Sequence, residues 1–377
     1  TEVPIPVRPP RPRTAADTCR RWFAAGAFVA CGTGLSLLLT LLYLLVRPFS
    51  RASYRRVAAS YAAAMFLDAM GLVLPNVRIR VTGDSDVPAG MGTSVVVANR
   101  QRECDWWVLL MMGRCVGLQG SIKIFLKEEM AKLPLVGYVV RLLEFPLVTG
   151  NWVGDRRRLS EQLRGFAAEP NPLHLLLFPE GWSGGDGALA KSTEFAIIER
   201  RPLLKHLLLP RNTGFSACLD SLRASSPVVY DVTVAYLGYN GSVPKSLDLS
   251  WYVLWTMICG NLPAEVHLKI KRYSMDEVLN DPKWLDKKWA EKDRLLSHFA
   301  RHQQFPADHR GFCRLRTFDT VTHGVETSFL ALVRLGLLPL LAPFVALLSI
   351  PLAWTVLWIW LAYRAFAMVL PSAEGGR

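Results

Sequence analysis

The stretch SVVVANRQRECDWW, residues 94–107, contains the transition that decides the fold class. Its first part, residues 94–98, is a run of β-branched and small side chains, which favours a buried strand. The strand ends at Asn99, and a polar turn then leads to Asp105 at the start of a helical, tryptophan-rich segment. An apolar strand that passes through a polar turn into a helix is typical of the α/β class.

A second stretch, HLLLFPEGWSGG at residues 174–185, repeats this pattern. Its apolar strand runs into a glycine-rich turn that begins at Pro179, Glu180 and Gly181. Taken singly, Asp105 fits a helix cap, and Pro-Glu-Gly fits an ordinary turn. Because open α/β sheets build their sites from polar groups at the ends of strands, the two stretches together favour a functional site.

Strands and helices alternate on both sides of these stretches, which predicts an α/β domain over residues 57–310. Runs rich in β-branched residues predict strands at 77–82, 94–98, 173–178, 228–236 and 266–273. Helical patterns occur at 57–75, 105–112, 127–145, 156–168, 192–200 and 214–224. Residues 276–302 form a charged amphipathic segment that we expect to be a solvated surface helix.

The composition favours a membrane setting. Hydrophobic residues make up 51% of the chain, and the net charge is +13. A nucleic-acid-binding protein would carry such charge on a polar domain, interleaved with aromatic residues. Here arginines crowd residues 8–21 and 47–56, on either side of an apolar segment, as basic residues do beside membrane spans. We therefore expect membrane lipids as partners and no nucleic acid.

Two apolar segments are expected to anchor the chain. Residues 22–46 contain no charged side chain, and at ~1.5 Å per residue they can form a transmembrane helix. Residues 335–363 contain three prolines, which fits either one kinked span or a hairpin. Residues 1–18 are rich in proline and arginine and are expected to be a disordered basic tail.

The seven cysteines are scattered, without a C-x-x-C pair or a Cys/His cluster. This spacing does not indicate a disulfide framework or a zinc site, so we predict no metal. We also expect no bound cofactor.

Four ordered blocks resemble the glycerophospholipid (lysophospholipid) acyltransferase family, and most closely its lysocardiolipin and 1-acylglycerol-3-phosphate acyltransferase branch. Asn99 and Asp105 stand at the ends of the family's N-H-x-x-x-x-D motif, and F-P-E-G is intact at 178–181. Two further elements, Pro-Arg-x-x-Gly-Phe and Asp-x-Thr-x-Ala-Tyr, match at 210–215 and 231–236. Residues 284–299 are similar to that branch's tail segment, so the resemblance covers roughly residues 75–310.

The resemblance implies a mixed sheet flanked by helices, located at the endoplasmic reticulum or another endomembrane. It implies transfer of a fatty-acyl group from acyl-CoA, as co-substrate, to a lysophospholipid of the lysophosphatidic acid or lysocardiolipin type. Asp105 is then expected to orient the polar network of the site. The expected substrate-binding residues are Asn99, Lys127, Phe178, Pro179, Glu180, Gly181 and Arg211.

Two positions depart from the family pattern. Arg100 occupies the place of the motif histidine, which is the family's general base. A guanidinium has a pKa above ~12 and no acceptor lone pair, so Arg100 cannot be that base. We expect it to pair with Asp105 or to hold a phosphate. When FPLVTGNW is aligned on Trp152, the position of the family's phosphate-binding arginine becomes Gly150.

Three interpretations of function remain open. The first is acyl transfer with another proton acceptor, such as Asp105 or Glu103. The second is a pseudoenzyme that keeps a lipid- or acyl-CoA-binding groove and acts as a membrane interaction protein. The third is a serine hydrolase that uses Ser183, because residues 181–185 match G-x-S-x-G. The first is the predicted function.

Overall fold

The computed structural model describes residues 26, 32–73, 77–88, 92–133, 136–181, 187–243, 262–306, 315–319, 354, 355, 358 and 360. The chain divides into two units, Thr1–Phe329 and Leu330–Arg377. All the elements discussed below belong to the first unit.

A seven-stranded sheet forms the centre of the domain, in the order β3-β6-β2-β7-β8-β1-β9. The strands are β1 (Arg78–Thr82), β2 (Thr93–Ala98), β3 (Ile122–Ile124), β6 (Leu173–Leu177), β7 (Val228–Tyr236), β8 (Glu265–Tyr273) and β9 (Leu315–Asp319). The four strands from β3 to β7 are parallel, as are β8 and β1, whereas β7 pairs antiparallel with β8 and β1 with β9. A separate parallel pair joins β4 (Leu126–Lys127) to β5 (Leu147–Val148).

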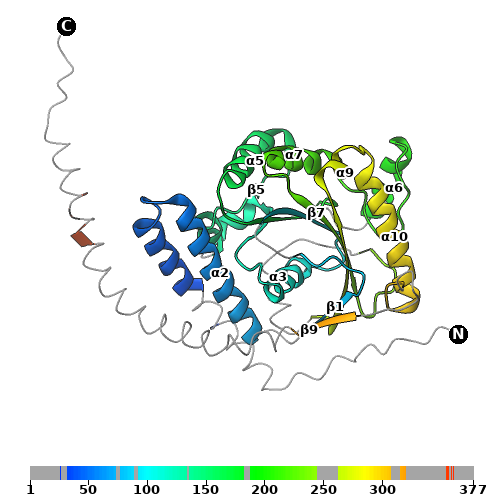
Figure 1. Ribbon diagram of the computed structural model, residues 1–377, viewed down its shortest axis with the longest axis horizontal. Helices are drawn as coiled ribbons and strands as arrows, with labels where there is room; N and C mark the ends of the chain where they lie inside the picture. The colour runs from blue at the N-terminus through cyan, green and yellow to red at the C-terminus, as the bar shows by residue number, and fades with distance from the viewer. Residues whose placement is uncertain are drawn as a thin grey trace, which may run out of the picture. The chain divides into compact units, whose positions relative to one another are not determined.

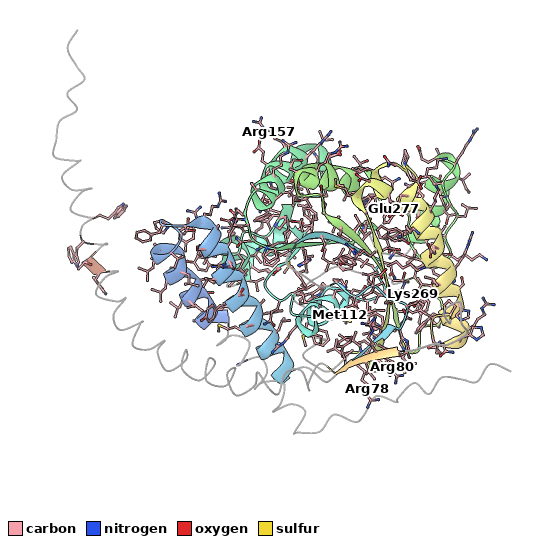
Figure 2. All side chains as sticks on the ribbon, in the orientation of Figure 1. Arg78, Arg80, Met112, Arg157, Lys269 and Glu277 are labelled. Atoms are coloured by element: carbon pink, nitrogen blue, oxygen red, sulfur yellow. The ribbon has the colours of Figure 1, made fainter. Side chains whose placement is uncertain are left out.

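Helices cover both faces of this sheet (Figure 1). One face packs on α2 (Arg51–Val73) and α3 (Asp105–Cys115), and the other on α5 (Trp152–Ala167), α7 (Asn212–Leu222), α9 (Met275–Leu279) and α10 (Trp284–His302). Successive side chains of a strand point to opposite faces of the sheet, so Val95 and Val97 of β2 pack into one core and Val96 packs against the other. In Figure 2, Met112 on α3 lies inside the domain and Arg157 on α5 points outward.

The remaining described helices are short. Apart from the helix at 32–45, they are α4 (Val136–Leu142), α6 (Ala188–Ile198) and the 3-10 turns η1 (Glu128–Lys132) and η2 (Arg223–Ser225). Only one side chain of α6, that of Ala196, is fully buried.

All five predicted strands are present, within one residue at either end. The predicted helix at 127–145 is wrong, because these residues form the end of β4, then η1, then α4. Pro134 lies in the middle of that segment and has no N–H to continue a helical ladder. The amphipathic segment predicted as one solvated helix at 276–302 forms two helices, and the longer one has a buried face as well as a solvated one. Pro282 separates α9 from α10, and α10 buries Trp289, Leu296 and Phe299 against the sheet.

Among the described residues, no helix is both long enough and apolar enough to cross a membrane. Residues 32–45 are helical, but much of the expected span at 22–46 lies outside the described residues. The segments at 1–18 and 335–363 also lie outside them, apart from positions 354, 355, 358 and 360.

Helix α2 is fixed to the domain by an ion-pair cluster and by one close backbone approach. Arg55 pairs with both Glu144 and Glu169. Gly120 has a φ of +84°, and a Cβ at this position would lie 2.8 Å from the Cα of Ser60 on α2. The absence of a side chain at residue 120 therefore allows the loop before β3 to contact the helix backbone.

Candidate active site

The turn between β2 and α3 is organised around the buried carboxylate of Asp105. Its Oδ2 accepts hydrogen bonds from the backbone N–H of Gln101 at 2.6 Å and of Arg102 at 3.0 Å. Its Oδ1 accepts one from the hydroxyl of Tyr236 at 2.5 Å. Burial raises the pKa of Asp105 to about 6, although these hydrogen bonds and the charge of Arg100 act in the opposite direction. Asp105 therefore fixes the conformation of the turn through its hydrogen bonds to the turn's backbone.

Asn99 connects the end of β2 to the neighbouring strand. Its Nδ2 donates to the carbonyl of Val234 at 3.1 Å, and its Oδ1 accepts from the N–H of the same residue at 2.7 Å. The side chain is fully buried, and these two bonds reproduce a backbone ladder across to β7. Asn99 thus aligns the strand ends and does not line the cavity described below.

Arg100 lies above the turn with its guanidinium over an aromatic ring. The Cζ atom is 4.6 Å from the centroid of the Phe178 ring, and 7% of the residue's surface is exposed. Its backbone N–H donates to Oε1 of Glu180 at 3.0 Å. Because a guanidinium keeps its charge at any ordinary pH, the site contains a fixed cation where the motif histidine would stand.

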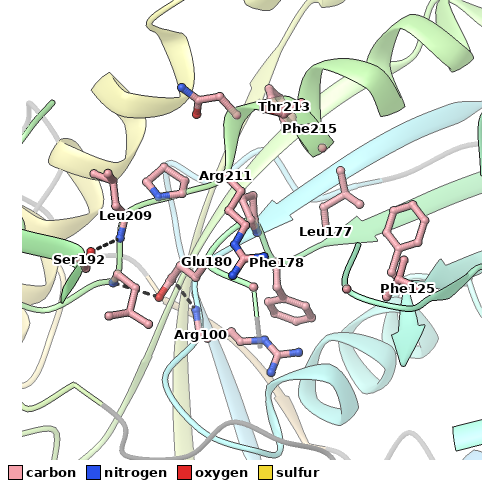
Figure 3. A pocket seen from close by; sticks show the side chains of 18 of the residues that line it. Arg100, Phe125, Leu177, Phe178, Glu180, Ser192, Leu209, Arg211, Thr213 and Phe215 are labelled. Atoms are coloured by element: carbon pink, nitrogen blue, oxygen red, sulfur yellow. Dashed lines mark hydrogen bonds between the residues drawn. The ribbon is translucent and has the colours of Figure 1, made fainter. Parts of the chain in front are cut away.

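Glu180 joins three segments of the site (Figure 3). Oε1 accepts from the N–H of Arg100, and Oε2 accepts from the N–H of Leu208 at 3.3 Å. Burial raises the pKa of Glu180 to about 7, against the lowering effect of these two bonds and of the Arg100 charge. The carboxyl group therefore changes its protonation state near neutral pH.

Gly181, the next residue, has a φ of +77°, where glycine is favoured over other residues. A Cβ at this position would lie 3.2 Å from Cζ of Arg211, so the bare glycine gives the guanidinium room to lie against the turn. The backbone N–H of Arg211 donates to the carbonyl of Pro179 at 2.9 Å. Arg211 precedes α7, and its side chain is exposed.

A cavity of about 860 Å³ lies above these residues. Arg100, Glu180 and Arg211 converge on it in Figure 3. Most of the remaining wall is apolar, and it includes Ile124, Phe125, Leu177, Phe178, Leu209, Phe215 and Cys218. The guanidinium groups of Arg100 and Arg211 and the carboxyl group of Glu180 form one polar end of the cavity. Asp155, Lys191 and Arg201 also line the cavity, and Arg201 pairs with Asp286. The apolar wall can accommodate an apolar chain.

The structure brings most of the predicted site residues together. Arg100, Arg211 and the whole 178–181 segment line the cavity, and Gly150 does too. Asn99 and Asp105 lie buried behind the turn. Lys127, half-buried in β4, is not among the cavity-lining residues, and Ser183 lies outside the described residues. In the part of the chain that the structure describes, no group of His, Cys, Asp and Glu side chains could hold a metal.

Sequence reasoning assigned no role to several neighbours of the site. The Tyr236 hydroxyl is a direct partner of Asp105, and a tyrosine at the end of a strand gives no sign of this in the sequence. Ser192 accepts the N–H of Leu209 at 2.8 Å and, with Lys191, lines the wall formed by α6. The buried Lys292 on α10 pairs with Asp231 on β7 at 2.6 Å.

Comparison with known proteins gives two matching domain families. The family described as "Acyltransferase" matches residues 78–235, and "Acyltransferase C-terminus" matches residues 256–325. A probable 1-acyl-sn-glycerol-3-phosphate acyltransferase 5 of Arabidopsis thaliana is 34% identical, over 56% of this chain and 55% of that protein.

Two other relatives extend the comparison. 1-acyl-sn-glycerol-3-phosphate acyltransferase 2 of Brassica napus is 28% identical, over 74% of this chain and 71% of the relative. Lysocardiolipin acyltransferase 1 of Mus musculus is 29% identical, over 60% and 59% of the two chains. The match to these three relatives thus spans between 55% and 71% of their length.

Proposed function

Because the chain belongs to the acyltransferase family, we propose that it transfers a fatty-acyl group from acyl-CoA to the free hydroxyl of a lysophospholipid. The observation that carries this proposal is the cavity, in which a long apolar wall ends at Arg100, Glu180 and Arg211. A lysophospholipid has the same division, with an apolar chain on one side and a phosphate next to a hydroxyl on the other. Substrates of this kind appear in the names of the relatives, which include lysocardiolipin and lysophosphatidylinositol acyltransferases.

In this proposal the two arginines hold the acceptor phosphate, because guanidinium groups bind phosphate oxygens in a bidentate manner. Arg100 thereby supplies charge to a site in which Gly150 occupies the position of the family's phosphate-binding arginine. Gly150 lines the cavity, and a Cβ there would meet no atom within 4 Å. Held at Arg100 and Arg211, the phosphate places its neighbouring hydroxyl near Glu180.

We further propose that the reaction takes place at an endomembrane, with residues 22–46 and 335–363 as anchors. Exposed apolar side chains next to the cavity support this setting. Phe195, Ile197 and Ile198 on α6 and the nearby Leu203 are each more than half exposed. The basic residues Lys191, Arg200 and Lys205 flank them, and such a surface suits anionic lipid headgroups.

A second candidate is lipid binding without catalysis. The observation that favours it is Arg100, since a general base typically contributes ~10²- to 10⁴-fold to rate and the motif histidine is absent. No histidine is among the described residues that line the cavity.

Transfer of labelled acyl groups from acyl-CoA into a panel of lysophospholipids separates the two candidates. The native chain, Arg100→His and Asp105→Asn are compared in the same membranes. We expect turnover in the native chain and its loss in Asp105→Asn, because the turn that holds Arg100 and Glu180 loses its anchor. Turnover that appears only in Arg100→His would overturn native catalysis and support the binding role.

A further inference from the structure

Attack of a hydroxyl on a thioester needs a proton acceptor beside the cavity, and Arg100 has no lone pair with which to act as one. Among the described residues that line the cavity, two carry carboxylates, Asp155 and Glu180. Asp105 lies behind the turn. Glu103, the other carboxylate predicted as a proton acceptor, is exposed and does not line the cavity, which leaves three groups to compare. The contacts of these three groups distinguish them.

Asp155 is fully engaged at the start of α5. Its Oδ2 accepts from both the N–H and the hydroxyl of Thr149, at 2.7 and 3.0 Å. Its Oδ1 pairs with Arg158 at 2.9 Å. A carboxylate with three donors, one of them a guanidinium, is a weak proton acceptor.

Asp105 is engaged to the same degree, with two backbone N–H groups on one oxygen and the Tyr236 hydroxyl on the other. Asp105 and Glu180 are similarly buried, at 2% and 4% exposed, but Asp105 does not line the cavity. A hydroxyl held in the cavity would have to displace the turn in order to reach it.

Glu180 differs in both respects, because it lines the cavity and accepts one backbone N–H at each oxygen. A carboxylate has about four lone-pair positions, so roughly half of its acceptor capacity is left. It also lies next to the two guanidinium groups that are proposed to hold the phosphate. We propose that Glu180 accepts the proton of the acceptor hydroxyl in the native chain, an inference that rests on the proposed acyl transfer.

The step balances without a co-reactant. As the hydroxyl oxygen bonds to the thioester carbonyl carbon, its proton passes to a carboxylate oxygen of Glu180. The tetrahedral intermediate then collapses, the C–S bond breaks, and the CoA thiolate takes the proton from the Glu180 carboxyl group. The products are the ester and the CoA thiol, and the carboxylate is restored.

The surrounding charges suit this role. The titratable and charged groups that act on Glu180, or on which it acts, are Arg100, Asp105, Tyr239 and Lys292. The Arg211 guanidinium lies against the next residue, Gly181. Burial outweighs the lowering effect of Arg100, which leaves the pKa of Glu180 at about 7. A general base works best when its pKa lies near the working pH.

The experiment uses the full chain in liposomes and compares the native protein with Glu180→Gln, Arg100→His and the Arg100→His/Glu180→Gln double variant. The surface substitution Glu161→Gln on α5 is the matched control.

We expect Glu180→Gln to lower kcat by ~10²- to 10⁴-fold, with a smaller change in KM. The double variant should regain at least ten-fold over Glu180→Gln, since a histidine next to Asp105 restores a proton acceptor. Native kcat should fall below a pH of about 7.

Three results would overturn the inference while leaving the proposed function in place. The first is turnover in the native chain together with a kcat for Glu180→Gln that lies within three-fold of the native value. The second is an active Arg100→His protein whose activity is lost, without any rescue, when Glu180→Gln is added, which would show a structural role. The third is a pH profile of native kcat that shows no fall between pH 8 and 6. This result decides the question if Arg100→His is itself inactive. No turnover in the native chain with any acceptor would contradict the proposed function, and the inference with it.

Discussion

At residue 100, an arginine in place of a histidine changes the chemistry of its neighbours. The guanidinium lies over Phe178 in a cation–π contact, worth roughly 0.5–2 kcal/mol, and the backbone N–H of Arg100 bonds to Glu180. The fixed charge lowers the pKa of both Asp105 and Glu180, although burial keeps each above its ordinary value. Arg100, at the position of the family's motif histidine, therefore cannot act as a base, and its charge lowers the pKa of the two neighbouring carboxyl groups.

Glu180 should impose a measurable pH dependence on stability. Its pKa is about 7 in the folded chain against an ordinary value of 4.5, so the native state binds the proton more tightly than the unfolded chain. This contribution is fully present below pH 4.5 and is lost as the pH rises through 7. Between pH 4.5 and 7 the free energy of unfolding of the native protein should therefore fall by on the order of 3 kcal/mol relative to that of Glu180→Gln. Urea unfolding of both proteins at pH 4.5 and 7.5 checks this, and parallel pH profiles would contradict it.

Arg211 is predicted to determine acceptor affinity. Arg211→Ala removes a charge-assisted contact worth roughly 1.5–3 kcal/mol, so KM for a lysophospholipid should rise about 10- to 100-fold while kcat changes less. Initial rates over a range of acceptor concentrations measure this effect. Arg157→Ala, at a side chain that is 91% exposed, is the matched control and should leave KM unchanged. An unchanged KM in Arg211→Ala would show that the phosphate binds elsewhere.

At the scale of elements, the loop before β3 and helix α2 depend on each other. Gly120→Ala would place a Cβ 2.8 Å from the Ser60 backbone at a φ of +84°, so the helix must shift. We expect a loss of roughly 1–3 kcal/mol, measured as a lower Tm and faster proteolysis at α2. Gly165→Ala on α5 meets no atom within 4 Å and should be neutral or stabilising. Equal changes in Tm for Gly120→Ala and Gly165→Ala would contradict a close contact between Gly120 and the backbone of α2.

For the whole molecule, one buried ion pair joins the two matched segments. Lys292 on α10 is fully buried and lies 2.6 Å from Asp231 on β7. Lys292→Met should cost roughly 3–5 kcal/mol because a carboxylate is left buried without its partner. The double variant Asp231→Leu/Lys292→Met should recover most of this loss. Denaturant unfolding tests it, and no recovery in the double variant would show that Lys292 stabilises the domain through other contacts.

The sequence alone predicted five of the seven strands of the main sheet, because strand signals are local, but it did not predict β3, β9 or the short pair β4 and β5. The five predicted strands needed only the β-branched runs and their turns, and the two motif turns followed from polar residues at strand ends. The error at 127–145 is of the same local kind, since an apolar helical pattern outweighed Pro134. The resemblance to the acyltransferases was also local, because it rests on four motifs in order along the chain, and the two matching domain families cover residues 78–235 and 256–325.

Only the tertiary structure decided which polar residues share the cavity. Residues 105 and 180 are both acidic and both follow strands, yet Asp105 lies behind the turn and Glu180 faces the substrate space. Lys127 lies outside the lining, and Tyr236 reaches Asp105 across 131 positions of sequence. Such contacts depend on how strands order within a sheet and on which face each side chain takes, and no local pattern encodes that. The residue proposed as the proton acceptor could therefore be identified only from the fold.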